Sequence, residues 1–144
     1  MMLLKVPGEK NEGCFRYKYN HISFVFGGVP GEILSKWING KFELIVSHEI
    51  LEEYREVSDI LKQKYPKIEP EPILNLITLK STLTFSVLLK EQVCEDPDDD
   101  KFIACALASN AKIIVSGDKH LLNVNGYRKL KILKPKEFLK EKCK

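Results

Sequence analysis

Residues 96–122, DPDDDKFIACALASNAKIIVSGDKHLL, decide the fold of this chain. Four aspartates in five positions lead into an apolar run, a pattern typical of a helix with an acidic first turn and one buried face. The next apolar segment, KIIVS, predicts a strand buried on both sides. Gly117 and Asp118 then predict a turn before a short helix. A helix followed directly by a buried strand favours an α/β fold.

The same alternation of helices and strands continues through the chain from residue 30 onward. Ser47 is a good N-cap for the longest predicted helix. The pattern predicts a single domain over residues 1–144, a three-layer α/β/α sandwich with a parallel central sheet of about five strands. The predicted helices span residues 30–40, 47–65, 71–81, 96–110 and 134–142, and the predicted strands span 41–47, 82–89, 111–116 and 130–133.

The net charge of the chain is +3, and the charge is polarised along the sequence. Residues 91–100 contain six acids and no base, whereas residues 119–144 contain nine Lys or Arg and two Glu. An acidic pocket beside a basic surface suits a metal-dependent enzyme acting on a polyanion. A solvated, Lys-rich helix face explains the basic end equally well.

Composition predicts a cytoplasmic protein with no contact to a membrane. No apolar run approaches the roughly 20 residues that span a bilayer, and the first residues do not resemble a secretory signal. The four cysteines are scattered, without a CxxC pair. Free thiols are therefore expected, and a zinc site is not.

Helix periodicity selects one glutamate in the segment that follows the strand at residues 41–47. At about 100° per residue, Glu53 lies at the edge of the apolar stripe, while Glu52 lies opposite it. Glu53 is therefore the acid expected to point inward. A glutamate at the rim whose stem covers apolar surface is the structural alternative.

The acidic run contains helix-starting residues and one further candidate. Asp96 as N-cap and Pro97 at the first position, with Asp98 and Asp99 in the first turn, are a standard helix start. Asp100 shares a face with Ile103, Ala104 and Leu107, and we expect it to point toward the sheet.

Asp118, after the strand at 111–116, completes a set of three acids with Glu53 and Asp100. An Asx turn or an N-cap is its structural alternative. The carboxyl ends of parallel strands meet at one edge of a sheet, so the three acids are expected there together. Crowded carboxylates repel one another unless a cation neutralises them, and Mg²⁺ or Mn²⁺ suits all-oxygen ligation.

The segments IVSHEILEEYREV, DPDDDKFIACALASNAKIIVSGDKHLL and ILKPKEFL resemble the PIN-domain family, and the resemblance covers residues 27–141. The closest branch consists of toxin components of toxin–antitoxin pairs related to VapC ribonucleases. The resemblance implies a Mg²⁺- or Mn²⁺-dependent ribonuclease whose second, third and fourth acids fall on Glu53, Asp100 and Asp118. Ser116 stands where the family usually has Thr, and His120 where a further Asp is common.

The chain departs from the family at the first acid. The family's first strand ends in Asp-Thr-Asn, and that register falls here on Arg16, which cannot replace a carboxylate ligand. Segments CFRYKY and HISFVF are the candidates for the central strand. AT-rich codons for residues 10–23, read one base later, permit MKVVLDTNIIIS, so we hypothesise that residues 1–23 are an out-of-frame version of a normal first strand. Sequencing the gene tests this.

We therefore expect an endoribonuclease in which Glu53, Asp100 and Asp118 hold the metal. Asp96 and Asp99 are expected as outer-shell ligands of the metal. The hydroxyls of Ser47 and Ser116 are expected to orient carboxylates or water. Lys119 and His120 are expected to contact phosphates of the substrate. The resemblance also implies a homodimer and an antitoxin partner. The alternative is a catalytically impaired module that binds RNA or an antitoxin, and a receiver-like or phosphatase-like domain is disfavoured because its motifs are absent.

Overall fold

The computed structural model describes residues 2–6, 11–16, 28–67, 69–109 and 113–142. Its helices are α2 (Gly28–Ile38), α3 (His48–Lys64), α4 (Glu71–Lys80), α5 (Asp100–Ala108), α6 (Lys119–Leu122) and α7 (Pro135–Lys142), with 3-10 turns η1 (Pro97–Asp99) and η2 (Tyr127–Lys129). Its strands are β1 (Met2–Val6), β2 (Asn11–Arg16), β3 (Glu43–Val46), β4 (Thr82–Leu83), β5 (Ile113–Ser116) and β6 (Lys131–Leu133). The α/β fold class predicted from the sequence is confirmed.

The sheet differs from the parallel sheet of about five strands that was predicted. It has six strands in the order β4-β3-β1-β2-β5-β6, and β1 is antiparallel to its neighbours. Strands β2, β3, β4, β5 and β6 pair with one another in parallel. The reason lies at the N-terminus, where four residues separate β1 from β2. A connection that short joins antiparallel strands, because a parallel pair needs a crossover of a dozen or more residues.

Strand β2 lies beside β5, where the first strand of the predicted fold was expected. Its register pairs Cys14 with Ile114 and Arg16 with Ser116. The segment CFRYKY therefore supplies part of this strand, while HISFVF lies outside the described residues. Arg16 ends β2 at the same edge of the sheet at which β5 ends.

The predicted strand over residues 82–89 is shorter than expected. Strand β4 contains Thr82 and Leu83, which pair with Ile45 and Val46. One further hydrogen bond joins the Thr84 amide to the Val46 carbonyl, at 2.9 Å. Because β3 ends at Val46, the chain beyond residue 84 has no partner among the described strands along which to continue.

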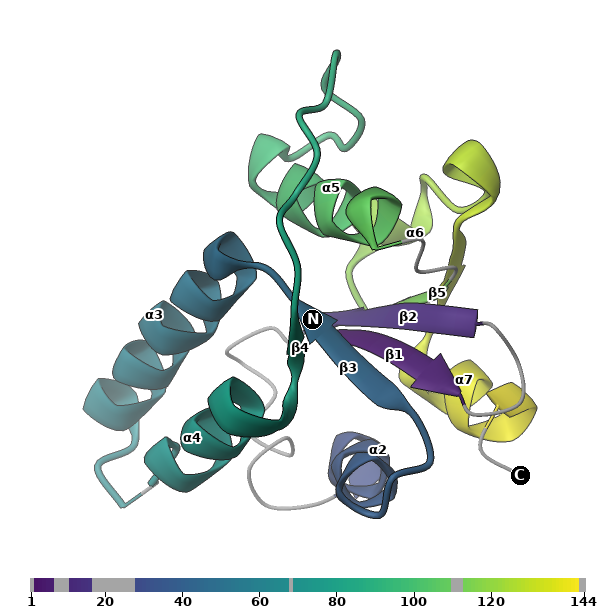
Figure 1. The fold of residues 1–144 in the computed structure, drawn as a ribbon. Coiled ribbons are helices and arrows are strands. Elements are labelled where there is room, and N and C mark those ends of the chain that lie inside the picture. Colours follow the sequence, from purple (N-terminus) through teal and green to yellow (C-terminus); the bar gives the residue numbers. More distant parts are fainter. Residues whose placement is uncertain (1, 7–10, 17–27, 68, 110–112, 143–144) are drawn as a thin grey trace.

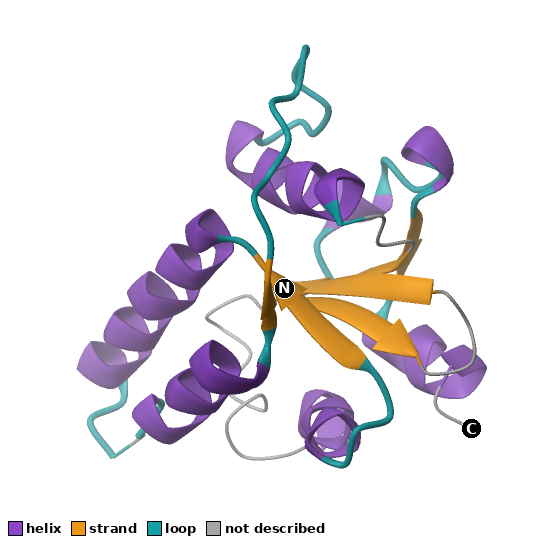
Figure 2. Ribbon diagram, viewed as in Figure 1, coloured by secondary structure: helices purple, strands orange, loops and turns teal. Residues whose placement is uncertain are grey.

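Helices cover both faces of the sheet (Figures 1 and 2), with α5 above it and α2 and α7 below it in this view. The core includes Trp37, Phe102 and Phe138, all fully buried. Phe138 of α7 meets Phe42 edge to face, with ring centroids 5.3 Å apart. Among the described residues, no helix combines the length and apolarity that crossing a bilayer requires.

Candidate active site

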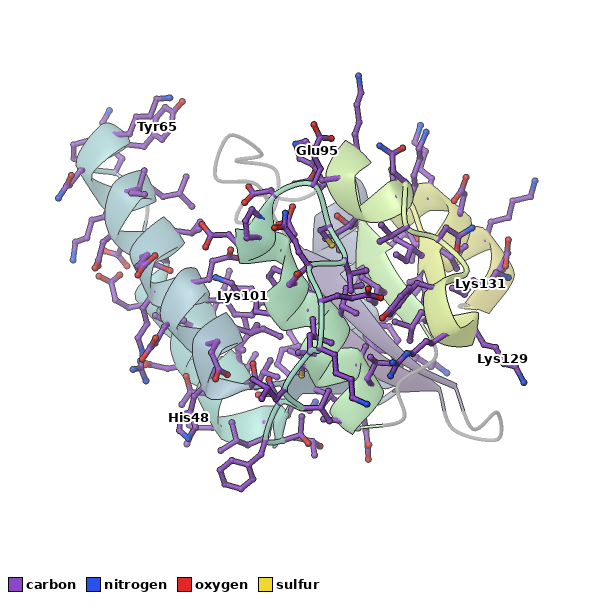
Figure 3. All side chains as sticks on the ribbon, turned by 90° about the horizontal axis from the view of Figure 1, so that it is seen from above. His48, Tyr65, Glu95, Lys101, Lys129 and Lys131 are labelled. Carbon is purple, nitrogen blue, oxygen red and sulfur yellow. The ribbon has the colours of Figure 1, made fainter. Side chains whose placement is uncertain are left out.

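Two side-chain contacts bring three segments of the chain to one edge of the sheet. Lys101 Nζ of α5 lies 3.5 Å from Glu53 Oε1 of α3. His120 Nδ1 of α6 lies 3.1 Å from Glu95 Oε2, just before η1. Figure 3 shows Lys101 on the side of α5 that faces α3. The starts of α3, α5 and α6 therefore gather where β3 and β5 end.

Glu53 is the inward-facing glutamate of α3, as the helix periodicity predicts. Its side chain is 12% exposed, whereas Glu49, Glu52 and Glu56 are exposed. Its proximity to Lys101 is an interaction that periodicity cannot show, because the lysine comes from another helix. A cation of the protein itself therefore lies beside this carboxylate.

Asp118 is buried at the start of α6. Its Oδ1 accepts a hydrogen bond of 2.9 Å from the His120 amide, which makes it the N-cap of this helix. The Asp118 amide donates to Ser116 Oγ, also at 2.9 Å. Ser116 is fully buried, so its hydroxyl holds the turn that presents Asp118 at the end of β5.

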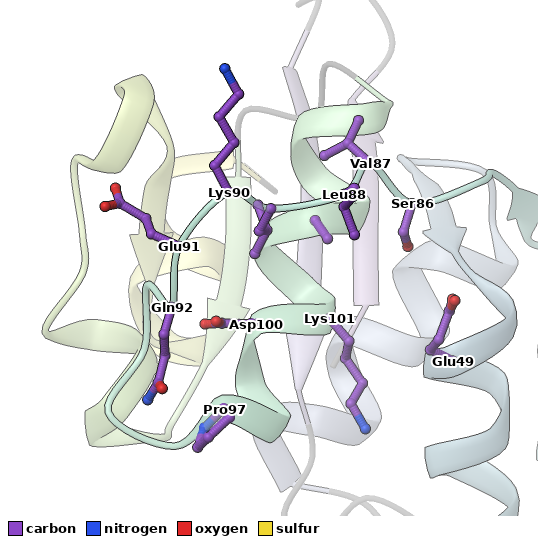
Figure 4. Close-up of a pocket in the computed structure, with 12 residues that line it drawn as sticks. Glu49, Ser86, Val87, Leu88, Lys90, Glu91, Gln92, Pro97, Asp100 and Lys101 are labelled. Carbon is purple, nitrogen blue, oxygen red and sulfur yellow. The ribbon is translucent and has the colours of Figure 1, made fainter.

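The acidic run starts a helix as predicted, but its last two acids have unexpected places. Asp96 caps η1, its Oδ1 accepting from the Asp98 amide at 3.0 Å, and Pro97 takes the first position. Asp100 accepts two backbone hydrogen bonds from the preceding loop, from the Cys94 amide at 2.7 Å and the Val93 amide at 3.1 Å. Figure 4 shows the Asp100 side chain directed toward this loop.

Asp99, rather than Asp100, is the most deeply buried acid of the run. Its exposed fraction is 0%, whereas Asp100 is half-buried. The expectation that Asp100 faces inward assumed a stripe through Leu107, which is only half-buried. The stripe that the structure buries completely runs through Phe102, Ile103 and Ala106, and Asp99 continues it toward the N-terminus.

Ser47 lies between α3 and α5. It is fully buried, and its Oγ caps α3 by accepting from the Ile50 amide at 3.3 Å. Burial raises the pKa of the Cys105 thiol to about 12, and a hydrogen bond with Ser47 opposes this rise. The site therefore holds Cys105 as a neutral thiol.

The raised pKa of Cys105 predicts a loss of stability at alkaline pH. The unfolded thiol ionises near its usual value of about 8.5, so the contribution is complete below that pH and falls as pH rises toward the folded pKa. Above about pH 9 the free energy of unfolding should fall by up to about 1.4 kcal/mol per pH unit from this group. Urea unfolding at several pH values measures the slope, and Cys105→Ala should flatten it. Equal slopes in the two proteins would refute the assignment.

The two predicted phosphate-binding residues lie on α6, beside the buried Asp118. Lys119 is exposed, and His120 is half-exposed and contacts Glu95. Lys119 can therefore reach a phosphate directly, whereas His120 would first have to break its contact with the Glu95 carboxylate.

The carboxylate oxygens at this edge of the sheet are ligands that suit a divalent cation, but the side chains are not spaced closely enough to coordinate one together. In the described part of the chain, no three His, Cys, Asp or Glu side chains are grouped as metal ligands. Asp99 and Asp118 are buried carboxylates, and burial of such charge is costly unless a cation or hydrogen bonds offset it. Binding of Mg²⁺ or Mn²⁺ would thus require local movement, including separation of Lys101 from Glu53.

Comparison with known proteins agrees with the resemblance seen in the sequence. A family model described as PIN domain matches residues 22–120. An uncharacterized protein from Methanocaldococcus jannaschii is 38% identical over 128 residues, covering 79% of this chain and 79% of the relative. No solved structure matches the chain. The family match leaves out the first 21 residues, where β1 and β2 lie.

Proposed function

Because the chain belongs to the PIN-domain family, whose members are generally nucleases, we propose that it hydrolyses RNA phosphodiesters at the carboxyl edge of its sheet. The observation that carries the proposal is the pair of buried carboxylates, Asp99 and Asp118, on two segments joined to each other and to α3 by side-chain contacts. Buried carboxylates near the carboxyl edge of a parallel sheet favour a functional site, because ligands of such sheets bind at that edge.

Within this proposal, the three acids that would bind the metal are Glu53, Asp99 and Asp118. Asp100, which the sequence analysis placed among the metal ligands, is instead proposed to position the loop at residues 93–94, because it accepts two backbone hydrogen bonds from that loop. A divalent cation such as Mg²⁺ or Mn²⁺, when bound by these carboxylates, would activate water and stabilise the leaving oxygen. Asp96 remains an outer-shell candidate.

The other polar residues at this edge position the acids and the substrate. Ser116 fixes the backbone at Asp118, and Ser47 fixes the start of α3. Lys119, exposed next to Asp118, would contact a substrate phosphate without reading sequence. By resemblance we further propose that the protein is a toxin component with an antitoxin partner, for which growth arrest on expression and its relief by the partner are the tests.

The Lys101–Glu53 contact should compete with metal binding. Replacing Lys101 with methionine keeps most of the apolar stem and removes the competing charge. We expect Mn²⁺ to bind several-fold more tightly, since a partly exposed ion pair is worth up to about 1 kcal/mol. Calorimetric titration measures this change. Lys62→Met, which removes the ion pair of an exposed lysine with Glu71, is the matched control and should leave Mn²⁺ affinity unchanged.

A second candidate function follows from Arg16. This residue ends β2 opposite Ser116, at the edge where the resembling family places its first acid. The sequence therefore has a cationic residue where the resembling family has a metal-binding carboxylate, which favours a catalytically impaired module that binds RNA or an antitoxin. Both functions include RNA binding, but only the nuclease cleaves RNA in a metal-dependent reaction.

Arg16→Asp tests which of the two functions this chain performs. We expect the wild-type protein to cleave single-stranded RNA weakly in Mn²⁺, and Arg16→Asp to increase the rate at least about tenfold by adding a fourth carboxylate. Arg55→Asp makes the same charge change on the exposed side of α3 and should not increase the rate. If neither the wild type nor Arg16→Asp cleaves RNA or binds Mn²⁺, while RNA binding persists, the impaired module is correct.

A further inference from the structure

A cavity of about 430 Å³ lies at the end of α5 that is farther from the candidate metal acids. Its described lining comes from residues 87–91, from Leu107 in the last turn of α5, and from Tyr127 and Arg128 in η2. Along the helix, about 12 Å separates Leu107 from Asp99. The volume is within the range of about 300–1,000 Å³ that small-molecule sites have.

The lining of this cavity combines apolar surface with positive charge. Leu88 and Leu107 contribute apolar surface, and Leu88 is 96% exposed, so a ligand can cover it. Among the charged side chains that line the cavity, Lys90 and Arg128 outnumber Glu91. Such a lining suits a ligand that has an apolar body and a negative charge.

Tyr127 and Arg128 place two planar groups side by side in this lining. The guanidinium carbon of Arg128 lies 5.6 Å from the centroid of the Tyr127 ring, which is a cation–π contact. Aromatic rings and guanidinium planes are both surfaces on which nucleobases stack. A guanidinium also binds phosphate through two parallel hydrogen bonds. The pair can therefore recognise both the base and the phosphate of a nucleotide.

The backbone beside this pair has an unusual conformation. Arg128 and Lys129 have φ of 46° and 67°, in the left-handed region that favours glycine. Side chains are rarely found there, and such residues cluster at ligand-binding sites, where the surrounding structure holds them. Three backbone hydrogen bonds of 2.8–3.0 Å close the turn within residues 126–130. Arg128 is therefore held beside Tyr127 before a ligand binds, which lowers the entropic cost of binding.

The opposite wall of the cavity, residues 87–91, is held on both sides. The Val87 amide donates to the Ala104 carbonyl at 3.4 Å, and Asp100 accepts hydrogen bonds from the 93–94 backbone. Figure 4 shows the Lys90 side chain extending away from Asp100. Lys90 is exposed, so a phosphate at the cavity can reach its ammonium.

We propose that this cavity binds a nucleotide, with the base stacked against Tyr127 and the phosphate held by Arg128 and Lys90. Stacking tolerates every base, and phosphate contacts carry no sequence information, so the site has little base preference. The ligand is a free mononucleotide or one unit of a single-stranded RNA. Binding of the RNA unit as substrate rests on the proposed nuclease function, whereas binding of the mononucleotide does not.

A second cavity connects this site with the candidate active site. It has a volume of about 510 Å³, shares residues 87–91 with the first cavity, and extends along α5 to Asp100 and Lys101 (Figure 4). Lys101 contacts Glu53, one of the proposed metal ligands. A single strand at the metal acids can therefore continue past residues 87–91 to Tyr127, which favours the RNA unit as the ligand.

Titration without a divalent metal tests the site on the full chain. In EDTA, calorimetry measures the binding of adenosine monophosphate and of a single-stranded oligoadenylate of about ten nucleotides. We expect Tyr127→Ala to weaken binding about tenfold or more, because it removes a stacking surface. Tyr127→Phe keeps the ring and should retain the wild-type affinity. Circular dichroism checks that each variant is folded.

Tyr65→Ala is the matched control. Tyr65 is also half-buried and also lies beside a cation, with Lys64 Nζ 5.8 Å from its ring centroid. Figure 3 shows Tyr65 far from Lys129, which follows the proposed site in the chain. This variant should bind both probes as the wild type does.

The salt dependence of oligoadenylate binding tests the phosphate contact. Lys90→Ala should lower the slope of log affinity against log salt by about 0.7, the value for one phosphate contact on a single strand. Lys41→Ala removes another exposed lysine and should leave the slope unchanged. If Tyr127→Ala does not fold, Lys90→Ala carries the test, because its side chain lies on the surface.

The two probes distinguish the sources of the ligand. Binding of adenosine monophosphate that depends on Tyr127 would identify a free nucleotide, and Tyr127-dependent binding of the oligonucleotide alone would identify an RNA unit. Equal affinities of the wild type and Tyr127→Ala for both probes, or binding of neither by the wild type, would overturn the proposal. A chain that binds RNA through Tyr127 but does not cleave it in Mn²⁺ would refute the nuclease and keep this site.

Discussion

Replacing Asp99 with asparagine is expected to lower the rate of metal-dependent RNA cleavage at least about 100-fold, because loss of a metal ligand should exceed the 10- to 100-fold typical of outer-shell changes. Asparagine keeps the size of the side chain and removes its charge. Asp99 is fully buried at the start of α5, so a side chain of equal size is needed there, and circular dichroism checks that the variant is folded. Initial rates on single-stranded RNA in Mn²⁺, together with calorimetric titration of Mn²⁺, measure the effect. The Arg16→Asp background is used if wild-type cleavage is too slow to measure.

Asp100→Asn is the matched control for this prediction. The neighbouring acid accepts hydrogen bonds from the Val93 and Cys94 amides, and hydrogen bonds to a charged group contribute about 1.5–3 kcal/mol each. The variant should therefore lose stability in urea unfolding while retaining most of its Mn²⁺ affinity. The reverse result, with affinity lost in Asp100→Asn and kept in Asp99→Asn, would return Asp100 to the inner set of ligands.

The largest expected effect on stability is that of Phe138→Ala, at about 3–5 kcal/mol. Phe138 is fully buried and packs edge to face against Phe42, which ties α7 to the segment leading into β3. Alanine would leave a cavity and remove the aromatic pair, which itself contributes about 0.5–1.5 kcal/mol. Because small domains are stable by only about 5–15 kcal/mol, much of the stability of the protein would be lost.

Urea unfolding followed by circular dichroism measures this loss. Leu79→Ala is the control, since that side chain is 85% exposed on α4 and its removal should change the free energy of unfolding by less than about 0.5 kcal/mol. Phe138→Leu, which keeps more of the volume, should fall between the two. A change below about 1 kcal/mol for Phe138→Ala would show that α7 contributes little to the core.

Helix periodicity and capping residues gave correct predictions for features that depend on a single helix. The periodicity of α3 predicts that Glu53 points inward, and Ser47 and Asp96 cap their helices as predicted. The periodicity of α5 was less decisive, since adjacent acids differ by only about 100° around a helix. The choice between Asp99 and Asp100 depended on which stripe the sheet covers. Phe102 would have indicated the correct stripe, because a large aromatic side chain is seldom placed at the edge of a buried face.

By itself, the sequence determined the α/β class, the order of most helices and strands from residue 30 onward, and their caps, because hydrophobic period and capping act over a few residues. Tertiary structure decided three other features. These are the antiparallel β1, the end of β4 where β3 ends, and the lysine of α5 that reaches a glutamate of α3. Each depends on which segments distant in sequence become neighbours, and local sequence carries no direct signal for that.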